Sequence, residues 1–336
     1  MTIKDLAAQT GYSLGTVSRV LNNQPNVSEK ARKAILEAAA ASGFQLNVNA
    51  KQLKQQRSNT ILVVVKGTSN QLFGSLLEAL QTQAARTTYP LYIDYLDEDE
   101  NEVRRAVQLC REKKPLGVLF LGGNRENFQQ DFHGIDQHCV LVTNDAAGLK
   151  YPNLSSVTSD DRQAGEMAID RLVSLGHRKI AVIGGDRDGS DIAQLRWEGC
   201  AKAFAAHGVT FDPVADYVST RFSYADGYQA AQTLLARGRE FTALYAMADV
   251  LAIGAIRALR DRGLQVPEDV SVIGVDGLAI GQYTVPKLAT VRQSVEELAR
   301  RSLEILRSKI EHDTAACYET IPVAVICRES VQAPQA

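Results

Sequence analysis

Three polar or basic side chains lie close together at Thr16, Ser18 and Arg19. Hydroxyl groups and a guanidinium can bond to phosphate oxygens and to the edges of DNA bases. Val17 and Val20 alternate with them, and apolar side chains of this kind favour the protein interior. The spacing therefore predicts a helix that buries its valines and presents its polar groups to solvent, where they could contact a nucleic acid.

The surrounding sequence predicts three short helices joined by tight turns. They are expected from Ile3 to Gly11, from Leu14 to about Leu21 and from Ser28 to Gly43, with Thr2, Ser13 and Ser28 as N-caps. The short connection around Gly11 has the spacing of a helix-turn-helix. A three-helix bundle with no nucleic-acid partner is the alternative that this pattern leaves open.

Net charge separates the N-terminal part from the remainder of the 336-residue chain. The whole chain has 37 Lys+Arg and 39 Asp+Glu, a formal charge of −2, which by itself argues against a nucleic-acid binder. Residues 1–58, however, hold 8 basic and 3 acidic residues, a net of +5, and the remainder has a net charge of −7. This asymmetry indicates an anionic partner for one end only.

Composition and missing motifs exclude several classes of protein. The sequence contains no run of about 18 apolar residues, so we expect no membrane span. Its N-terminus lacks the apolar stretch of a signal peptide, so we expect a cytoplasmic protein. The five cysteines include no C-x-x-C pair and the five histidines lack metal-ligand spacing. Motifs of phosphate-binding loops, serine hydrolases and zinc proteases are missing. We expect no metal, no cofactor and no enzymatic activity.

Residues 45–58 are polar and basic, with almost no core-forming side chains. Part of this segment favours helix but is too short to be stable alone, so it is expected to fold when a partner supplies contacts. We place a hinge segment at 46–58, between a helix-turn-helix domain at 1–45 and a larger domain at 59–336.

From residue 61 onward, apolar runs alternate with amphipathic helical stretches. This order predicts an α/β fold with parallel sheets covered on both faces. The length and a split near 153–160 predict two doubly wound subdomains with a ligand cleft between them. We expect an N-subdomain of about 59–157 plus 291–318 and a C-subdomain of about 158–290 plus 319–336.

Two glycine pairs, Gly122-Gly123 and Gly184-Gly185, each follow an apolar run. Tight turns from strand to helix are the favoured explanation, and phosphate binding is the alternative.

An ordered set of short motifs spans nearly the whole chain. It comprises Thr16-Val17-Ser18-Arg19-Val20-Leu21-Asn22, Ser156-Val157-x-x-Asp160, Leu175-Gly176-His177-Arg178-Lys179, Arg196-x-x-Gly199, Val266-Pro267-Glu268-Asp269-Val270-Ser271 with Gly274-x-Asp276, Leu288-x-Thr290-Val291-Arg292-Gln293 and Arg328-Glu329-Ser330. The set resembles the LacI/GalR family of bacterial transcription regulators. That resemblance implies a homodimer that binds DNA under the control of an effector, with a body similar to periplasmic sugar-binding proteins.

The resemblance implies a set of DNA-binding residues. Base-reading positions are Leu14, Gly15 and Arg19; phosphate or neighbouring contacts fall to Ser13, Thr16, Ser18 and Asn22; and the hinge contributes Asn47, Ala50, Leu53 and Lys54. Arg19 can bond to guanine in bidentate fashion, and Leu53 can enter the minor groove as an apolar wedge. A solvated charge or phosphate contact for Arg19, and packing on the body for Leu53, are the alternatives. Leu46 stands where the family usually has a proline.

The same resemblance implies effector contacts in the body. They are Arg196, Asp249, Asp276, Phe222 and Phe73, with Asn144 and Asp160 as weaker candidates. For the aspartates, helix capping or a structural salt bridge is the alternative, and for Phe222 it is core packing. Lys66 and Gly277 depart from the family pattern, which suggests an acidic effector group that Lys66 could meet. Replacing Arg196 with alanine is expected to abolish ligand binding and to leave the fold intact.

These observations predict a cytoplasmic transcriptional repressor that binds a palindromic operator as a homodimer and responds to a small effector. A sugar or sugar derivative is the favoured effector, and a purine-like ligand is the alternative. A solute-binding protein without DNA affinity, an enzyme of the doubly wound class, and an activator or dual regulator are the rival hypotheses. No coiled coil is expected in the last residues, so we predict a dimer without a tetramerisation element.

Overall fold

The computed structural model of the chain describes residues 3–21, 27–42, 58–67, 70–187, 191–238 and 240–335. The chain divides into two compact units, Met1–Ser58 and Asn59–Ala336, which we call the head and the body. Among the described residues, no helix is long and apolar enough to cross a membrane.

The described residues of the head form three helices, α1 (Ile3–Thr10), α2 (Leu14–Leu21) and α3 (Glu29–Ala41), as the capping pattern predicts. Their shared core is built around Leu6, Val17 and Ile35, whose side chains are fully buried. Ser13 and Ser28 cap α2 and α3, because their hydroxyls accept backbone N–H groups three residues on. The expected cap at Thr2 and stop at Gly43 lie outside the described residues.

One sheet of the body forms the N-subdomain, and all of its strand pairs are parallel. Its strand order is β11-β5-β4-β3-β1-β2. The strands are β1 (Ile61–Lys66), β2 (Leu91–Leu96), β3 (Gly117–Leu121), β4 (His138–Val142), β5 (Leu154–Ser159) and β11 (Tyr318–Ile321). Apolar clusters cover both faces, one with α5 (Gln71–Ala84) and α12 (Val295–His312), the other with α6 (Glu102–Lys113) and α7 (Arg125–Asp131).

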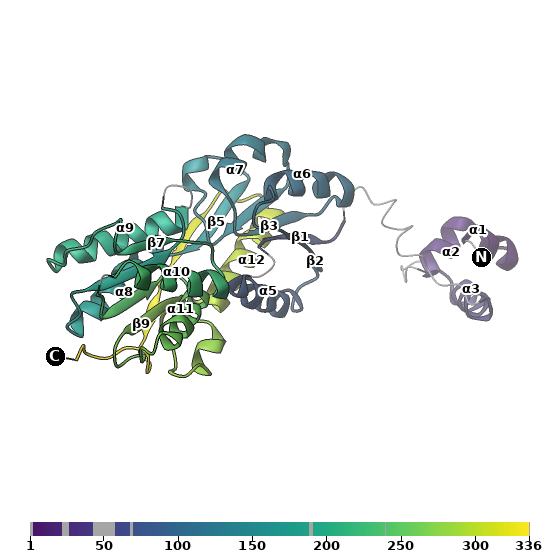
Figure 1. Ribbon diagram of the computed structural model, residues 1–336. Coiled ribbons are helices and arrows are strands. Elements are labelled where there is room, and N and C mark those ends of the chain that lie inside the picture. Colours follow the sequence, from purple (N-terminus) through teal and green to yellow (C-terminus); the bar gives the residue numbers. More distant parts are fainter. Residues whose placement is uncertain are drawn as a thin grey trace. The chain divides into compact units, whose positions relative to one another are not determined.

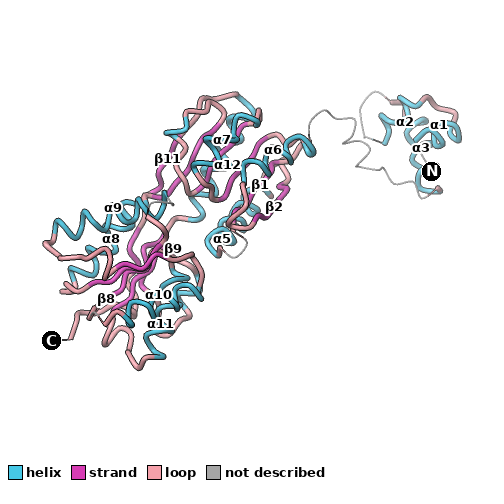
Figure 2. The backbone as a smooth tube through the Cα atoms, turned by 45° about the horizontal axis from the view of Figure 1, so that its top comes forward, coloured by secondary structure: helices cyan, strands magenta, loops and turns pink. Residues whose placement is uncertain are grey.

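The second sheet forms the C-subdomain, and Figure 2 shows its strands as a separate group from those of the first sheet. Its order is β12-β10-β9-β8-β6-β7, parallel except for the pair of β10 with β12. The strands are β6 (Ile180–Gly184), β7 (Tyr217–Ser219), β8 (Ala243–Ala246), β9 (Ser271–Asp276), β10 (Ala289–Arg292) and β12 (Ala324–Ile326). The covering helices are α8 (Asp161–Ser174) and α9 (Asp191–Ala206) on one face, and α10 (Tyr224–Ala236) and α11 (Asp249–Asp261) on the other (Figure 1).

The chain passes between the sheets three times, after Ser159, Arg292 and Ile321. The sequence predicts these crossings at about 157, 290 and 318. All three lie two or three residues further on in the structure, and the third moves most, because Tyr318 pairs with Ser156 and keeps β11 in the sheet of the N-subdomain. Pairing between strands this far apart in sequence leaves no local pattern, so the chain's own periodicity could not locate this crossing.

Candidate DNA-binding and effector sites

Helix α2 presents the side chains that the sequence assigned to DNA. Val17 and Val20 are buried, whereas Leu14 is 42% exposed and Arg19 is exposed. Gly15 and Arg19 are four residues apart, so they share one face of the helix. The arrangement offers a guanidinium and an apolar side chain on the exposed side of a helix, which suits entry into the major groove.

Polar residues at the start of α2 are held in place within the head. The hydroxyl of Ser13 lies 2.9 Å from that of Thr16 and also accepts the Thr16 N–H. Thr16 and Ser18 are half-buried. The remaining predicted DNA contacts, Asn22, Asn47, Ala50, Leu53 and Lys54, lie outside the described residues.

In the C-subdomain, Arg196 forms the centre of a buried polar cluster. Its side chain is 5% exposed, and its Nε donates to Asp161 over 2.8 Å. A second nitrogen donates to the carbonyl of Met247, and a third lies 3.8 Å from Asp276. The structure thus brings together Arg196 and Asp276, two of the proposed effector contacts, and bonds the guanidinium to partners within the protein.

Asp249 lies fully buried at the start of α11, and one of its carboxylate oxygens accepts the N–H of Leu278 over 2.7 Å. Its other oxygen has no hydrogen-bond partner and packs on Gly274, where a Cβ atom would lie 2.3 Å from it. Asp249 therefore secures the turn after β9, a structural role other than the helix cap or salt bridge that the sequence left open for it.

Burial sets the protonation of these carboxyl groups. It raises the pKa of Asp249 to about 8, with help from the neighbouring charge of Asp276. Burial also raises the pKa of Asp276 to about 6, although Arg196 opposes the shift. For Arg196 itself, burial acts to lower the pKa, but Asp161 and Asp276 raise it above its usual range. Arg196 consequently stays charged, while Asp249 holds a proton near neutral pH.

Backbone strain occurs at the carboxyl ends of strands in both sheets. Asp276 has a φ of +119° at the end of β9, and Thr143 has a φ of +80° directly after β4. Residues other than glycine rarely adopt a positive φ, and backbone strain of this kind concentrates at functional sites. Asn144, the residue after Thr143, accepts a hydrogen bond from its hydroxyl over 3.2 Å.

The two predicted phenylalanines pack on glycines that directly follow strands β3 and β6. A Cβ on Gly122 would lie 2.7 Å from the ring of Phe73, and one on Gly185 would lie 2.8 Å from the ring of Phe222. The glycine pairs thus allow close ring packing as well as the turns expected from the sequence. Phe73 is buried in the core, whereas Phe222 is half-buried. The ring of Phe222 is the more accessible of the two.

Two other residues with predicted roles, Asp160 and Lys66, bond to partners within the protein. Asp160 caps α8 by accepting the N–H of Gln163 over 2.9 Å. The ammonium of Lys66 lies 2.6 Å from the buried carboxylate of Glu102 and 2.6 Å from the carbonyl of Glu100. The charge of Lys66 is therefore compensated within the protein, and an acidic effector group at this position stays a prediction.

Three residues to which the sequence assigned no role, Asp161, Gln293 and Ser159, connect this cluster to the segments that pass between the two subdomains. Asp161 pairs with Arg196, as described above. The side-chain amide of Gln293 donates to Asp276 over 2.8 Å and accepts from Ser159 over 2.6 Å. Asp161 and Gln293 lay beside or at the end of the motifs quoted above, so the signal was present but carried no assigned role.

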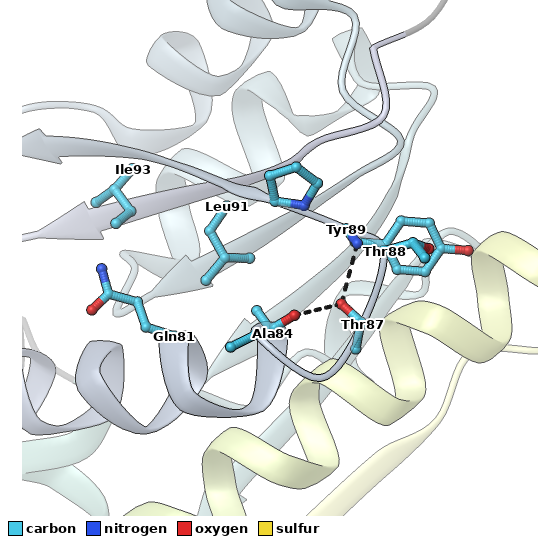
Figure 3. A pocket seen from close by; sticks show the side chains of 9 residues that line it. Gln81, Ala84, Thr87, Thr88, Tyr89, Leu91 and Ile93 are labelled. Atoms are coloured by element: carbon cyan, nitrogen blue, oxygen red, sulfur yellow. Dashed lines mark hydrogen bonds between the residues drawn. The ribbon is translucent and has the colours of Figure 1, made fainter. Parts of the chain in front are cut away.

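A surface pocket lies elsewhere, between the end of α5 and the start of β2 (Figure 3). Gln81, Ala84, Tyr89, Leu91 and Ile93 are among its lining residues. Parallel sheets bind ligands at the carboxyl ends of their strands, and this pocket is at the amino end of β2. It is therefore separate from the candidate effector residues.

Comparison with known proteins places both units in one family. Residues 2–47 match the model of bacterial regulatory proteins of the lacI family, and 169–331 match a periplasmic binding protein-like domain. HTH-type transcriptional regulator MalR of Clostridium butyricum is 31% identical over 335 residues, 98% of this chain and 99% of that protein. Probable HTH-type transcriptional repressor ExuR of Bacillus subtilis (strain 168) is 32% identical and covers 94% of each chain.

Solved structures agree with this match. The complex of transcriptional regulator CelR with cellobiose superposes with a TM-score of 0.73 at 26% identity, covering 98% of this chain and 99% of that one. The Lac repressor dimer bound to operator and the anti-inducer ONPF has a TM-score of 0.84 at 23% identity and 99% coverage of each chain, a likeness that shows the fold. The chain belongs to the lacI family of bacterial regulatory proteins. It is a helix-turn-helix transcriptional regulator, and its relatives are regulators and not enzymes.

Proposed function

We propose that this regulator represses transcription in the cytoplasm by binding a palindromic operator as a homodimer. The observation that carries the proposal is the surface of α2, where Leu14, Gly15 and Arg19 are exposed while Val17 and Val20 are buried. The net charge of +5 over residues 1–58 supports it, since phosphate contacts supply much of the affinity for DNA. The hinge residues from Asn47 to Lys54 are proposed to add minor-groove contacts.

The body is proposed to bind a sugar or sugar derivative between its subdomains. Buried carboxyl groups next to Arg196 offer hydrogen-bond acceptors for hydroxyls, and the half-buried ring of Phe222 offers an apolar face. CelR, a structural neighbour, was solved with cellobiose. Effector binding would change the relation of the subdomains and so order or loosen the hinge, which couples the ligand to DNA affinity.

Dimerisation is supported by exposed apolar side chains in the C-subdomain. Ile280, Tyr283 and Val285 lie within six residues of one another and are 43%, 79% and 74% exposed. Clusters of exposed apolar groups mark interaction surfaces more often than isolated ones do. A two-fold dimer places two heads on the two halves of a palindromic operator.

A mobility-shift assay with the promoter fragment beside the chain's own gene tests the proposal. We expect specific retardation that weakens steeply with added salt. A thermal-shift screen of the full chain with sugars, sugar phosphates and nucleobases would identify the effector, because a ligand that binds the folded state raises its Tm. Failure to retard any promoter fragment, with or without ligands from the screen, would refute DNA-based repression.

A further inference from the structure

Two contacts join the subdomains at residues 221–224, the segment between β7 and α10. The guanidinium of Arg221 lies 3.1 Å and 3.0 Å from the two carboxylate oxygens of Asp99, in the loop between β2 and α6. The hydroxyl of Tyr224, the first residue of α10, faces the side chain of Gln71, the first residue of α5, which acts to lower the pKa of this hydroxyl. One short segment of the C-subdomain is therefore attached to two separate elements of the N-subdomain.

The loop that receives Arg221 is acidic and anchored. Four consecutive acidic side chains, at 97–100, are exposed to solvent. The Asp97 N–H donates to the carboxylate of Glu100 over 2.8 Å, and the carbonyl of Glu100 accepts from Lys66 over 2.6 Å. The loop thus offers a concentrated negative charge in a fixed position, to which a guanidinium is attracted.

Phe222, a candidate effector contact, lies between the two attachment points. Its ring packs against the apolar clusters on both faces of the C-subdomain sheet and covers Gly185 at the end of β6. Any separation of the subdomains at this segment would therefore act directly on a residue beside the candidate site.

We propose that Arg221 and Tyr224 form a clasp that holds the two subdomains together over the candidate effector site. Opening requires loss of the Arg221–Asp99 ion pair and separation of Tyr224 from Gln71. Because Arg221 and Asp99 are 64% and 74% exposed, salt screens their attraction, and opening becomes dependent on ionic strength. The consequence for gene control rests on the proposed function, whereas the clasp itself can be tested without DNA or effector.

Distances between spin labels in the full chain test the clasp. Labelled noncanonical amino acids at Glu78 on α5 and Gln229 on α10 avoid the native cysteines. In low salt we expect a dominant short distance. Substituting R221A, or adding salt to the unsubstituted protein, raises the ratio of long to short distances roughly twofold to fivefold, the range typical of an exposed pair.

Two controls separate the clasp from general effects of charge. The double substitution D99R/R221D keeps an ion pair with its signs exchanged and is expected to restore the short distance. K179A removes an ion pair of 2.8 Å within the C-subdomain, where both side chains are more than half exposed, and is expected to change nothing. An R221A distribution equal to that of the unsubstituted protein, or a double substitution that stays open, would overturn the clasp. A promoter gel shift of the unsubstituted protein reports separately on the proposed function.

Discussion

Arg19 offers the most direct residue-scale test of DNA reading. It is exposed on α2, and a bidentate bond from arginine to guanine is worth about 1–3 kcal/mol of discrimination. We expect Arg19→Ala to weaken operator binding about 5- to 150-fold and to reduce the preference for operator over unrelated DNA, measured by fluorescence anisotropy. Lys33→Ala, an exposed basic residue of α3, serves as the control and should lower affinity for both DNAs by a similar factor. Equal losses for the two variants on both DNAs would assign Arg19 to phosphate contact alone.

Substitution of Arg196 is a poor test of ligand contact, because the residue also stabilises the fold. Because it is buried against Asp161 and Asp276, Arg196→Ala leaves two carboxyl groups without their cation. Breaking a buried pair in this way costs about 3–5 kcal/mol. Urea denaturation should therefore show a large loss of stability, which contradicts the expectation from sequence that the fold persists. An unchanged midpoint would mean that the carboxyl groups neutralise themselves by binding protons.

Asp249 predicts a specific dependence of stability on pH. Its pKa is raised from 3.8 to about 8 in the folded state, so the folded protein binds this proton more tightly than the unfolded chain does. The resulting stability is complete below pH 3.8 and is lost as the pH rises through about 8. The Tm should fall as the pH rises from about 4 to about 8 and level off above that, and Asp249→Asn should flatten this decline. The exposed Asp136→Asn is the control and should retain the decline in full.

At the scale of elements, glycines set how closely α8 and α9 approach. A Cβ on Gly165 would lie 2.0 Å from the carbonyl oxygen of Arg196, and one on Gly199 would lie 2.0 Å from that of Arg162. The Arg-x-x-Gly motif therefore combines a buried cation with a helix contact that admits no side chain. Backbone atoms cannot move aside as a flexible side chain can, so the position requires glycine.

Gly199→Ala tests this contact. We expect a loss of about 1–3 kcal/mol in the free energy of unfolding, the usual cost of overpacking. Gly74→Ala in α5 is the matched control, because a Cβ there meets no atom within 4 Å. Since alanine favours helix over glycine, the control should gain up to about 1 kcal/mol. A Gly199→Ala variant as stable as the control would show that α8 and α9 separate at little cost.

Local signals predicted most elements and failed for short ones. The caps Ser13 and Ser28 and the apolar runs that became β1 and β6 act within a few residues, so the sequence locates them. Strands β5, β7, β10, β11 and β12 were not predicted. The sequence of β5 is rich in serine and threonine, and the other four have only three or four residues, which carry little periodicity.

At the scale of the whole molecule, the assembly state connects the body to the operator. Tyr283→Asp places a charge among the exposed apolar side chains near Ile280, and we expect a shift from dimer to monomer in sedimentation velocity. Operator affinity should fall by about tenfold or more, because two linked heads bind far more tightly than one. Val214→Asp, at an isolated apolar side chain that is 81% exposed, is the control and should stay dimeric. A dimeric Tyr283→Asp variant would place the interface elsewhere.

The net charge of the whole chain conceals opposite charges on its N-terminal residues and on the remainder. The total of −2 combines +5 over residues 1–58 with −7 over the remainder. An acidic body repels phosphate, so it helps to restrict DNA to the head. The negative loop at 97–100, which receives Arg221, is part of that acidity and serves a contact within the body.

The sequence alone determined the helix-turn-helix head, the two α/β subdomains and the family, because caps, periodicity and motifs are properties of neighbouring residues. Only the tertiary structure decided how charges are paired. Arg196 meets Asp161 and Asp276, and Lys66 meets Glu102, across separations that no local pattern encodes. Burial then raises the pKa of Asp276, and Arg196 bonds to Asp161 and to the backbone of Met247 within the protein. The energy of a charged side chain depends on the surroundings that folding brings to it, which is why residue types indicated a site and the fold assigned their partners.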